Sequence, residues 1–252
     1  MIEDTININT ASGIMKTFIV RPEGNKAYPA VVLFMDIWGV RDELRQIARR
    51  LASQGYVAML PNLYYRQGEI AYEFFDERSR MISLHHLEKT RSDLVYAQRR
   101  RLSNEMILSD IAEILGFIET DKYILSDKVG AIGWCMGGWI CLKAGVTFAQ
   151  KFRAIATLHA TKPISETNDS PHRELNKLRG GLYSGWAELD HLSPPDMVQE
   201  FEDLIEVEKV DYRGVTHNGV EHGYALPDRD IYCPEAAAKD WEQIIKLYKD
   251  YL

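Results

Sequence analysis

Hydrophobic and polar residues recur along this chain with two different periods. Short apolar or alternating runs, rich in β-branched residues, predict strands that are buried in a sheet. These runs cover residues 5–9, 15–21, 30–35, 56–61, 128–133, 152–158, 180–186 and 209–215. Longer segments carry apolar residues at three- and four-residue spacing, which predicts amphipathic helices. These segments cover residues 41–55, 103–120, 136–150, 194–208 and 234–252.

The order of these elements predicts an α/β fold. Strands and helices alternate almost throughout, which is typical of a mainly parallel sheet with helices on both faces. The chain has 252 residues, and neither an internal repeat nor a Pro/Ser-rich linker divides it. We therefore expect a single domain over residues 1–252.

Residues at about 64–101 interrupt this alternation. They are charged and aromatic and lie between a predicted strand and the next predicted core helix. We expect a partly helical excursion over the carboxyl ends of the strands, where open α/β sheets bind ligands. The alternative is a solvated helical insertion without a role in binding.

Composition and charge exclude several classes of partner. The formal net charge of -7 argues against nucleic acid or an anionic membrane as the main partner. The N-terminal residues form no signal peptide, and no apolar run approaches the ~20 residues of a membrane span. The three cysteines show no CxxC spacing, so we predict neither disulfides nor a zinc site, and no metal or cofactor. A reducing, cytoplasmic location is the resulting expectation.

The segment GWCMGG places Cys135 among glycines, between a predicted strand and a predicted helix. This is the layout of a nucleophile elbow, whose tight turn accepts only small residues two positions before and after the nucleophile. Gly133 and Gly137 occupy those positions, and Gly138 lets the helix approach the strand. The helix N-terminus favours both a thiolate and the negative charge of a reacting carbonyl. The alternative is a small buried cysteine, which is what we expect of Cys141 in the following helix.

An elbow nucleophile needs an acid and a base, which in this architecture follow in the order nucleophile, acid, histidine. Asp190 comes just after a predicted strand, and His222 follows the last predicted strand. Both lie at carboxyl ends of strands, on the side of the elbow. Cys135, Asp190 and His222 are therefore the candidate triad. His217 is the alternative base.

The other histidines are weaker candidates for the site. His159 follows a predicted strand and is expected either to line the pocket or to be structural. His191 adjoins the candidate acid but is expected to point elsewhere. His85 and His86 lie in the excursion and are expected on the surface.

Motifs in consecutive order resemble the dienelactone hydrolase family, the cysteine branch of the α/β-hydrolases. They are FMDIWGVRDELRQIARRLASQGYVAMLPNLYYRQG, DERSR, GWCMGG, GWAELDHLSPPD and EHGYA. The similarity covers nearly the whole chain. It implies an α/β-hydrolase fold and the hydrolysis of ester or lactone bonds.

Carried over residue by residue, the resemblance implies roles for the candidate triad and its surroundings. Cys135 would be the nucleophile, His222 the base and Asp190 the acid that orients it. The oxyanion hole would consist of the backbone N–H groups of Ile37 and Met136.

The chain departs from the family pattern at two charged positions of the pocket. The family has a glutamate beside the thiol, where this chain has Asp36. Members that act on dienelactone bind its carboxylate with two arginines. Arg80 matches one of them, Leu226 stands where the other is expected, and Arg229 is close but out of register. We expect Asp36 to restrain the thiol and Arg80 to bind substrate, while the departure weakens the case for dienelactone itself.

These residues predict a hydrolase that acts on a small-molecule ester or lactone, including carboxylate-bearing ones, through a thioester acyl-enzyme. Two alternatives stay open. One is a general carboxylesterase with small neutral substrates. The other is a non-catalytic α/β-hydrolase-like protein that binds ligands or senses thiols.

Overall fold

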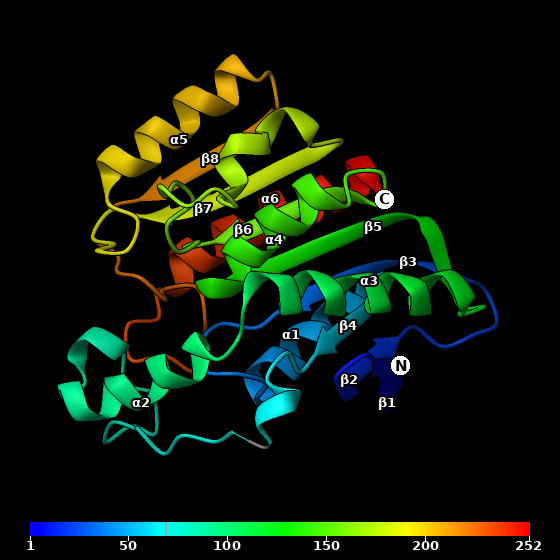
Figure 1. Cartoon of the computed structure of the whole chain (residues 1–252), viewed down its shortest axis with the longest axis horizontal. Helices are drawn as coiled ribbons and strands as arrows, with labels where there is room; N and C mark the ends of the chain where they lie inside the picture. Colours follow the sequence, from blue (N-terminus) through cyan, green and yellow to red (C-terminus); the bar gives the residue numbers. More distant parts are fainter. Residues whose placement is uncertain (69) are drawn as a thin grey trace.

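The computed structural model describes residues 1–68 and 70–252, which are built around an eight-stranded sheet. The strands are β1 (Ile2–Thr10), β2 (Gly13–Arg21), β3 (Tyr28–Phe34), β4 (Val57–Pro61), β5 (Ile124–Trp134), β6 (Phe152–Leu158), β7 (Gly181–Ala187) and β8 (Asp211–His217). Their order in the sheet is β1-β2-β4-β3-β5-β6-β7-β8 (Figure 1). β2 pairs antiparallel with β1 and β4, and the remaining pairs are parallel. The predicted mainly parallel α/β fold is confirmed.

Helices cover both faces of the sheet, which explains why its central strands are apolar along their whole length. The helices are α1 (Asp42–Ser53), α2 (Lys89–Arg100), α3 (Asn104–Thr120), α4 (Met136–Thr147), α5 (Pro195–Val207) and α6 (Pro234–Tyr251). α3 and α4 lie on one face and α1 and α6 on the other (Figure 1). Arg50 of α1 stacks on Trp241 of α6, 4.2 Å from the ring centroid. Every residue of β4 and β7 is buried between these layers.

Residues 64–68 and 70–101 leave the sheet and form a separate wall beside its carboxyl end. They contain two short 3-10 helices, η1 (Tyr65–Gln67) and η2 (Leu84–His86), and α2, which stands apart from the sheet in Figure 1. A small apolar cluster attaches this wall to the loop after β3 and consists of Ile37, Trp38, Met81 and Val95. The N–H of Met81 also donates to the carbonyl of Asp228, after β8, at 2.8 Å. The wall therefore joins two loops at one edge of the sheet.

The start of α3 follows its sequence signal. Oγ of Ser103 accepts a hydrogen bond from the N–H of Met106 at 3.2 Å, so Ser103 is the N-cap of α3. A third 3-10 helix, η3 (Pro171–Lys177), was not predicted, because its period differs from that of an amphipathic α-helix. In the described part of the chain, no helix is long and apolar enough to cross a membrane.

Candidate active site

The turn at Cys135 leaves no room for side chains two residues to either side. Cys135 follows β5 and opens α4 with a positive φ of 57°, which non-glycine residues rarely adopt. A Cβ on Gly133 would lie 2.2 Å from the carbonyl oxygen of Gly137. A Cβ on Gly137 would lie 2.0 Å from the carbonyl oxygen of Phe34. Both distances are far below van der Waals contact, so only glycine permits this strand–turn–helix geometry.

The thiol of Cys135 lies at the N-terminus of α4, beside a threonine that the sequence analysis did not identify. Sγ is 3.3 Å from Oγ1 of Thr161. The N–H of Thr161 donates to the carbonyl of Cys135 at 3.1 Å, which fixes Thr161 against the turn. Thr161 follows β6 in a loop whose sequence carries no motif, so its position depends on how neighbouring strands are paired.

His222 and Asp190 form a buried pair. Nδ1 of His222 lies 2.6 Å from Oδ2 of Asp190, and the two side chains are 10% and 1% exposed. Oδ1 of Asp190 accepts hydrogen bonds from the N–H groups of Leu192 at 2.8 Å and Ser193 at 3.2 Å. Nε2 of His222 has no hydrogen-bond partner among the described residues. The structure thus brings the predicted acid and histidine together and leaves one ring nitrogen free.

Electrostatic interactions couple His222 to Cys135. Burial opposes protonation of His222, but the charges of Cys135 and Asp190 and the hydrogen bond with Asp190 outweigh it and raise its pKa to about 10. Burial raises the pKa of the Cys135 thiol, but His222 and the hydrogen bond with Thr161 outweigh burial and hold that pKa below its usual range. The opposite shifts belong to one coupled pair, in which thiolate and imidazolium stabilise each other.

Two residues with backbone N–H groups that donate to no other described residue line the same cavity. Ile37 lies in the loop after β3, and Met136 is the first residue of α4. Both line the cavity that contains Cys135. Neither N–H donates a hydrogen bond to another described residue, and the first N–H groups of a helix have no intrahelical partner. Both groups are therefore available to an acceptor in the cavity.

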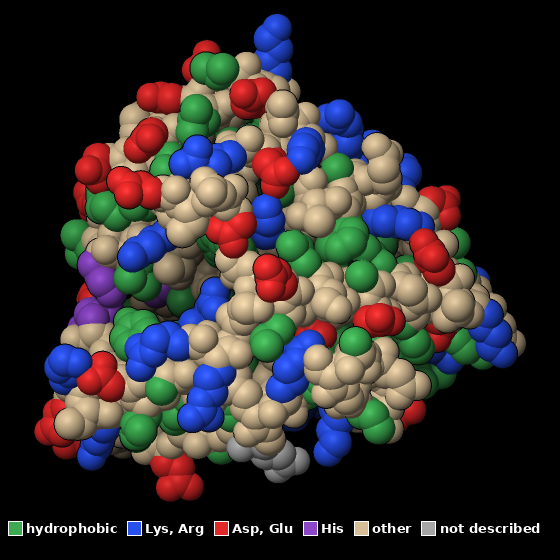
Figure 2. Space-filling model, viewed as in Figure 1, with side chains coloured by type: hydrophobic (Ala, Val, Ile, Leu, Met, Phe, Trp, Pro, Cys, Tyr) green, Lys and Arg blue, Asp and Glu red, His purple; other side chains and the backbone are tan. Residues whose placement is uncertain are grey.

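Cys135 and His222 open into a cavity of about 470 Å³, a size that suits a small molecule. The wall of residues 64–101 forms one side, and loops after β3, β6, β7 and β8 form the others. The lining residues are Ile37, Trp38, Leu84, His85, Tyr96, Arg99, Asn104, Cys135, Met136, Trp139, His159, Thr161, Lys162, Ser165, Thr167, His191, Leu192, His222, Gly223 and Arg229. Figure 2 shows a hollow in this face of the molecule, with histidine side chains at its edge.

Two arginines that were not expected in the pocket line this cavity. Arg229 is 5% exposed, and its Nε has no hydrogen-bond partner among the described residues. Arg99 of α2 donates to the carbonyl of Leu102 and to Oδ1 of Asn104, and no described carboxylate pairs with it. Burial lowers the pKa of both arginines, although Asp36 opposes this at Arg229. Arg229 lies three residues after Leu226, the position where the family pattern has its second arginine. Residues 99–101 are all arginines, and the sequence does not indicate which of them enters the cavity.

Asp36, the carboxylate expected beside the thiol, is held by two arginines. Its two oxygens accept hydrogen bonds from Arg41 at 2.7 and 3.1 Å, and Nη1 of Arg229 lies 3.6 Å away. It is not among the described residues that line the cavity. Burial has the largest influence on the pKa of Cys135. The negative charge of Asp36 also raises that pKa, but its influence is smaller than those of burial, His222 and Thr161. Asp36 is therefore mainly the partner of two arginines.

Arg80, expected to bind substrate, is paired within its own segment. Nε and Nη2 of Arg80 donate to Oδ2 of Asp76 at 3.0 and 2.9 Å, and the side chain is 36% exposed. Arg80 is absent from the described cavity lining. The DERSR segment closes on itself, since Oδ1 of Asp76 also accepts from the N–H groups of Arg78 and Arg80. Leu226, at the other expected arginine position, is fully buried.

The histidines divide into three groups. His217 is buried with its Nε2 2.7 Å from Oδ1 of Asp240, and it is not among the described residues of the cavity lining. His159 lines the cavity, and neither of its ring nitrogens has a partner among the described residues. Burial holds the pKa of His159 well below its usual value, so it is neutral. His191 also lines the cavity, which corrects the expectation that it points elsewhere. His85 is exposed, as expected, and lies in the cavity lining as well.

His85 belongs to a cluster that the sequence analysis missed. A ring nitrogen of His85, a ring nitrogen of His86 and a carboxylate oxygen of Glu221 lie within 4.8 Å of one another. These are atoms that can coordinate a metal ion. The sequence motifs gave no indication of this cluster. The signal was weak, because 135 residues separate His86 from Glu221 in the sequence.

Comparisons with known proteins identify the family and agree with the fold. A sequence model of the dienelactone hydrolase family matches residues 15–252. A Synechocystis protein described as "putative carboxymethylenebutenolidase" is 25% identical over 236 residues, which cover 93% of this chain and 91% of the relative. A dienelactone hydrolase structure from Anabaena variabilis superposes with a TM-score of 0.68 at 14% identity, covering 100% of this chain and 98% of that one. A Klebsiella pneumoniae structure described as "putative dienelactone hydrolase" superposes with a TM-score of 0.84 at 19% identity, covering 99% of each chain.

Proposed function

Because the chain belongs to the dienelactone hydrolase family, we propose that it hydrolyses a small ester or lactone with Cys135 as nucleophile, His222 as base and Asp190 as the acid that orients it. One observation carries this proposal. A cysteine held at positive φ shares a cavity with a histidine whose Nδ1 is bound to a carboxylate and whose Nε2 is free. This is the donor and acceptor arrangement of a nucleophilic triad.

The charges of the resting site favour the reactive form of the nucleophile. The lowered pKa of Cys135 and the raised pKa of His222 favour a thiolate–imidazolium pair at neutral pH. Asp190 accepts the Nδ1 proton and so presents Nε2 towards the thiol. Thr161 donates a further hydrogen bond to the thiolate.

The first half of the reaction forms a thioester. The thiolate of Cys135 attacks the carbonyl carbon, and the N–H groups of Ile37 and Met136 stabilise the negative oxygen of the tetrahedral intermediate. The C–O bond then breaks, and His222 gives its Nε2 proton to the leaving alkoxide. In a lactone this alkoxide stays attached to the acyl group.

The second half releases the acid. His222, now neutral, takes a proton from a water molecule that attacks the thioester carbon. The C–S bond breaks, the carboxylic acid leaves, and the thiolate–imidazolium pair is restored. The complete reaction consumes one water molecule and regenerates the enzyme, so this scheme requires no cofactor.

The charges in the cavity favour substrates that carry a carboxylate. Arg99 and Arg229 both line the cavity, and Arg99 has no described carboxylate partner. A guanidinium in a largely apolar pocket binds a carboxylate by a charge-assisted hydrogen bond. The apolar rings of Trp38 and Trp139 accommodate the remainder of a small molecule.

Pre-steady-state kinetics with an activated aryl ester test the mechanism. We expect a burst of product followed by slower turnover, with a thioester on Cys135 detectable by mass spectrometry. Cys135→Ala should give neither the burst nor the adduct, whereas Cys233→Ala, which changes a cysteine outside the cavity, should keep both. A full burst in Cys135→Ala would refute the assignment, and no burst in the wild type would favour a binding protein.

A pair of esters of equal size, one anionic and one neutral, tests the substrate class. A charge-assisted hydrogen bond contributes about 1.5–3 kcal/mol, or about 10- to 150-fold. Arg99→Met should lower kcat/KM for the anionic ester by about tenfold or more and leave the neutral ester nearly unchanged. Arg80→Met is the matched control outside the cavity. Equal losses for both esters in Arg99→Met would favour the general carboxylesterase, whose neutral substrates fit the apolar lining.

A further inference from the structure

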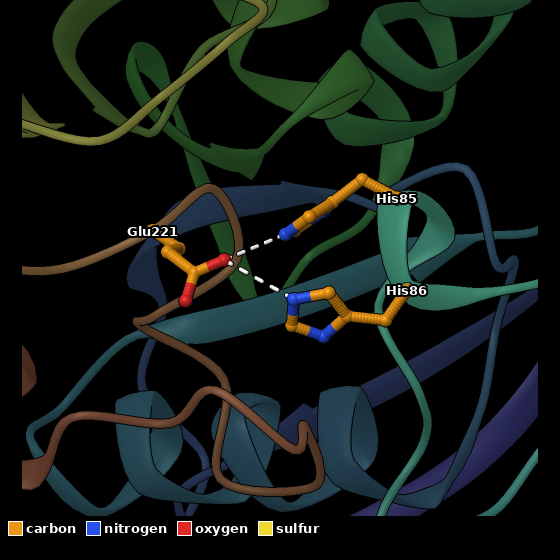
Figure 3. Close-up of side chains that lie close together, drawn as sticks. All are labelled: His85, His86 and Glu221. Atoms are coloured by element: carbon orange, nitrogen blue, oxygen red, sulfur yellow. Dashed lines mark hydrogen bonds and ion pairs between the residues drawn. The ribbon is translucent and has the colours of Figure 1, made fainter.

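Three metal-ligand side chains converge at the edge of the cavity, away from the thiol. Nε2 of His85 lies 2.6 Å and Nε2 of His86 lies 3.4 Å from Oε2 of Glu221. Figure 3 shows both imidazoles directed at the same carboxylate, the histidines from η2 and the glutamate from the loop after β8. Two ligands of a tetrahedral Zn²⁺ at about 2.0–2.2 Å from the ion are about 3.3–3.6 Å apart. The pair of His86 and Glu221 already has this spacing, and His85 needs only a small displacement.

A second carboxylate orients His86 for a metal. Nδ1 of His86 lies 3.1 Å from Oδ2 of Asp230. Asp230 is fixed in turn by the N–H of Ser83 at 3.0 Å and by its hydroxyl at 2.5 Å. This contact places the proton of His86 on Nδ1 and leaves the lone pair of Nε2 facing Glu221. Metal-binding histidines almost always have such a carboxylate or carbonyl partner on the other ring nitrogen.

Charge and access also suit a divalent cation. Glu221 in the ligand set and Asp230 behind it carry two negative charges that balance the two positive charges of the ion. The side chains of His86 and Glu221 are 43% and 36% exposed, so an ion reaches them directly from solvent. Two imidazoles and one carboxylate form a donor set that Zn²⁺ uses with a fourth, open position.

We propose that His85, His86 and Glu221 form a binding site for Zn²⁺ at the edge of the cavity. The ion would join η2 to the loop that carries His222, because Glu221 immediately precedes that histidine in the chain. It would therefore hold the wall of residues 64–101 against the active-site loop. The site is separate from the proposed reaction, which uses neither His86 nor Glu221.

Calorimetric titration of Zn²⁺ into Cys135→Ala protein tests this site without interference from the thiolate. We expect saturable binding of one ion per chain. His86→Ala and Glu221→Gln, each made in the same background, should weaken that binding by at least about tenfold, as loss of ligands or their orienting partners does. The two variants act on different segments, so a folding defect in one leaves the other informative.

His172→Ala in the same background is the matched control. His172 is a half-buried histidine whose Nδ1 contacts Ser170, outside the cluster, so its loss should not change the affinity. Zn²⁺ should also slow amide hydrogen exchange in residues 83–87 and in residues 219–223, because the ion bridges them. Absence of saturable binding, unchanged affinity in both cluster variants, or protection of neither segment would overturn the proposal. None of these results depends on turnover, so they stand apart from any failure of the proposed hydrolytic mechanism.

Discussion

Two buried histidine–carboxylate pairs lie close together at the end of β8, and only one of them faces the cavity. Nε2 of His217 is 2.7 Å from Oδ1 of Asp240, and Nδ1 of His222 is 2.6 Å from Oδ2 of Asp190. The distances are nearly equal, and all four side chains are at most 10% exposed. Pair geometry alone therefore does not distinguish a structural histidine from a candidate base.

The surroundings of the two carboxylates make the difference. Asp240 also accepts hydrogen bonds from the hydroxyls of Tyr183 at 2.7 Å and Tyr224 at 2.8 Å. Burial and the charge of Asp240 raise the pKa of both tyrosines, so their hydroxyls keep the protons that they donate. His217 is part of this packed network, whereas Nε2 of His222 is left without a described partner. Reactivity requires a group that the fold has oriented but not fully satisfied.

The largest expected effect on activity comes from replacing His222 by alanine, compared with the same replacement of His217. His222→Ala should lower kcat by about 10⁴-fold or more, since loss of a triad base typically costs this much. His217→Ala should cost far less activity and appear mainly as a lower free energy of unfolding, since it leaves Asp240 with fewer partners. Steady-state kinetics with an aryl ester and urea unfolding measure the two quantities. A greater activity loss in His217→Ala would reverse the comparison and reassign the base.

The two carboxylates provide the next comparison. Asp190→Asn should lower kcat by about 10³- to 10⁴-fold, because an amide no longer fixes the tautomer of His222. Asp240→Asn should keep most of the activity but lower the free energy of unfolding by about 1–3 kcal/mol, because it disturbs a buried network. The same assays apply. Similar activities in the two variants would show that orientation by Asp190 is unimportant.

The pH dependence of alkylation examines the coupling of His222 to Cys135. The lowered pKa of Cys135 predicts fast reaction with iodoacetamide at neutral pH, which slows as the pH falls through that pKa and the thiolate is protonated. In His222→Ala the positive charge is lost, so the pKa of Cys135 rises. Each unit by which that pKa lies higher lowers the alkylation rate at neutral pH about tenfold. His217→Ala should keep the wild-type profile. Mass spectrometry of Cys135 measures the rates, and identical profiles in all three proteins would exclude the ion pair.

The smallest expected effect is that of Asp36. Its charge raises the pKa of Cys135, although burial, His222 and Thr161 have larger influences. Asp36→Asn should therefore lower that pKa by less than about one unit and increase alkylation at acidic pH by less than about tenfold. A slower reaction in Asp36→Asn would mean that its pairing with Arg41 and Arg229 supports the thiolate instead.

Much of the fold and the centre of the site could be predicted from the sequence because the causes are local. Apolar runs and helical spacing predicted the alternating sheet, since burial on both faces requires continuous apolar strands. The glycines around Cys135 predicted the elbow, because any Cβ at Gly133 or Gly137 would overlap a carbonyl oxygen. Asp190 and His222 followed from strand order, since parallel strands bring their carboxyl ends to one edge.

Only the tertiary structure decided which charged side chains surround that centre. Arg80 is retained by Asp76 in its own turn, while Arg99 enters the cavity because α2 packs through Val95 against the loop after β3. His86 and Glu221 meet only because residues 64–101 cross to the loop after β8. Such contacts depend on how a wall is rotated and docked against distant loops. No periodicity within a single segment records that choice, because each long polar side chain has several partners within reach until the elements pack.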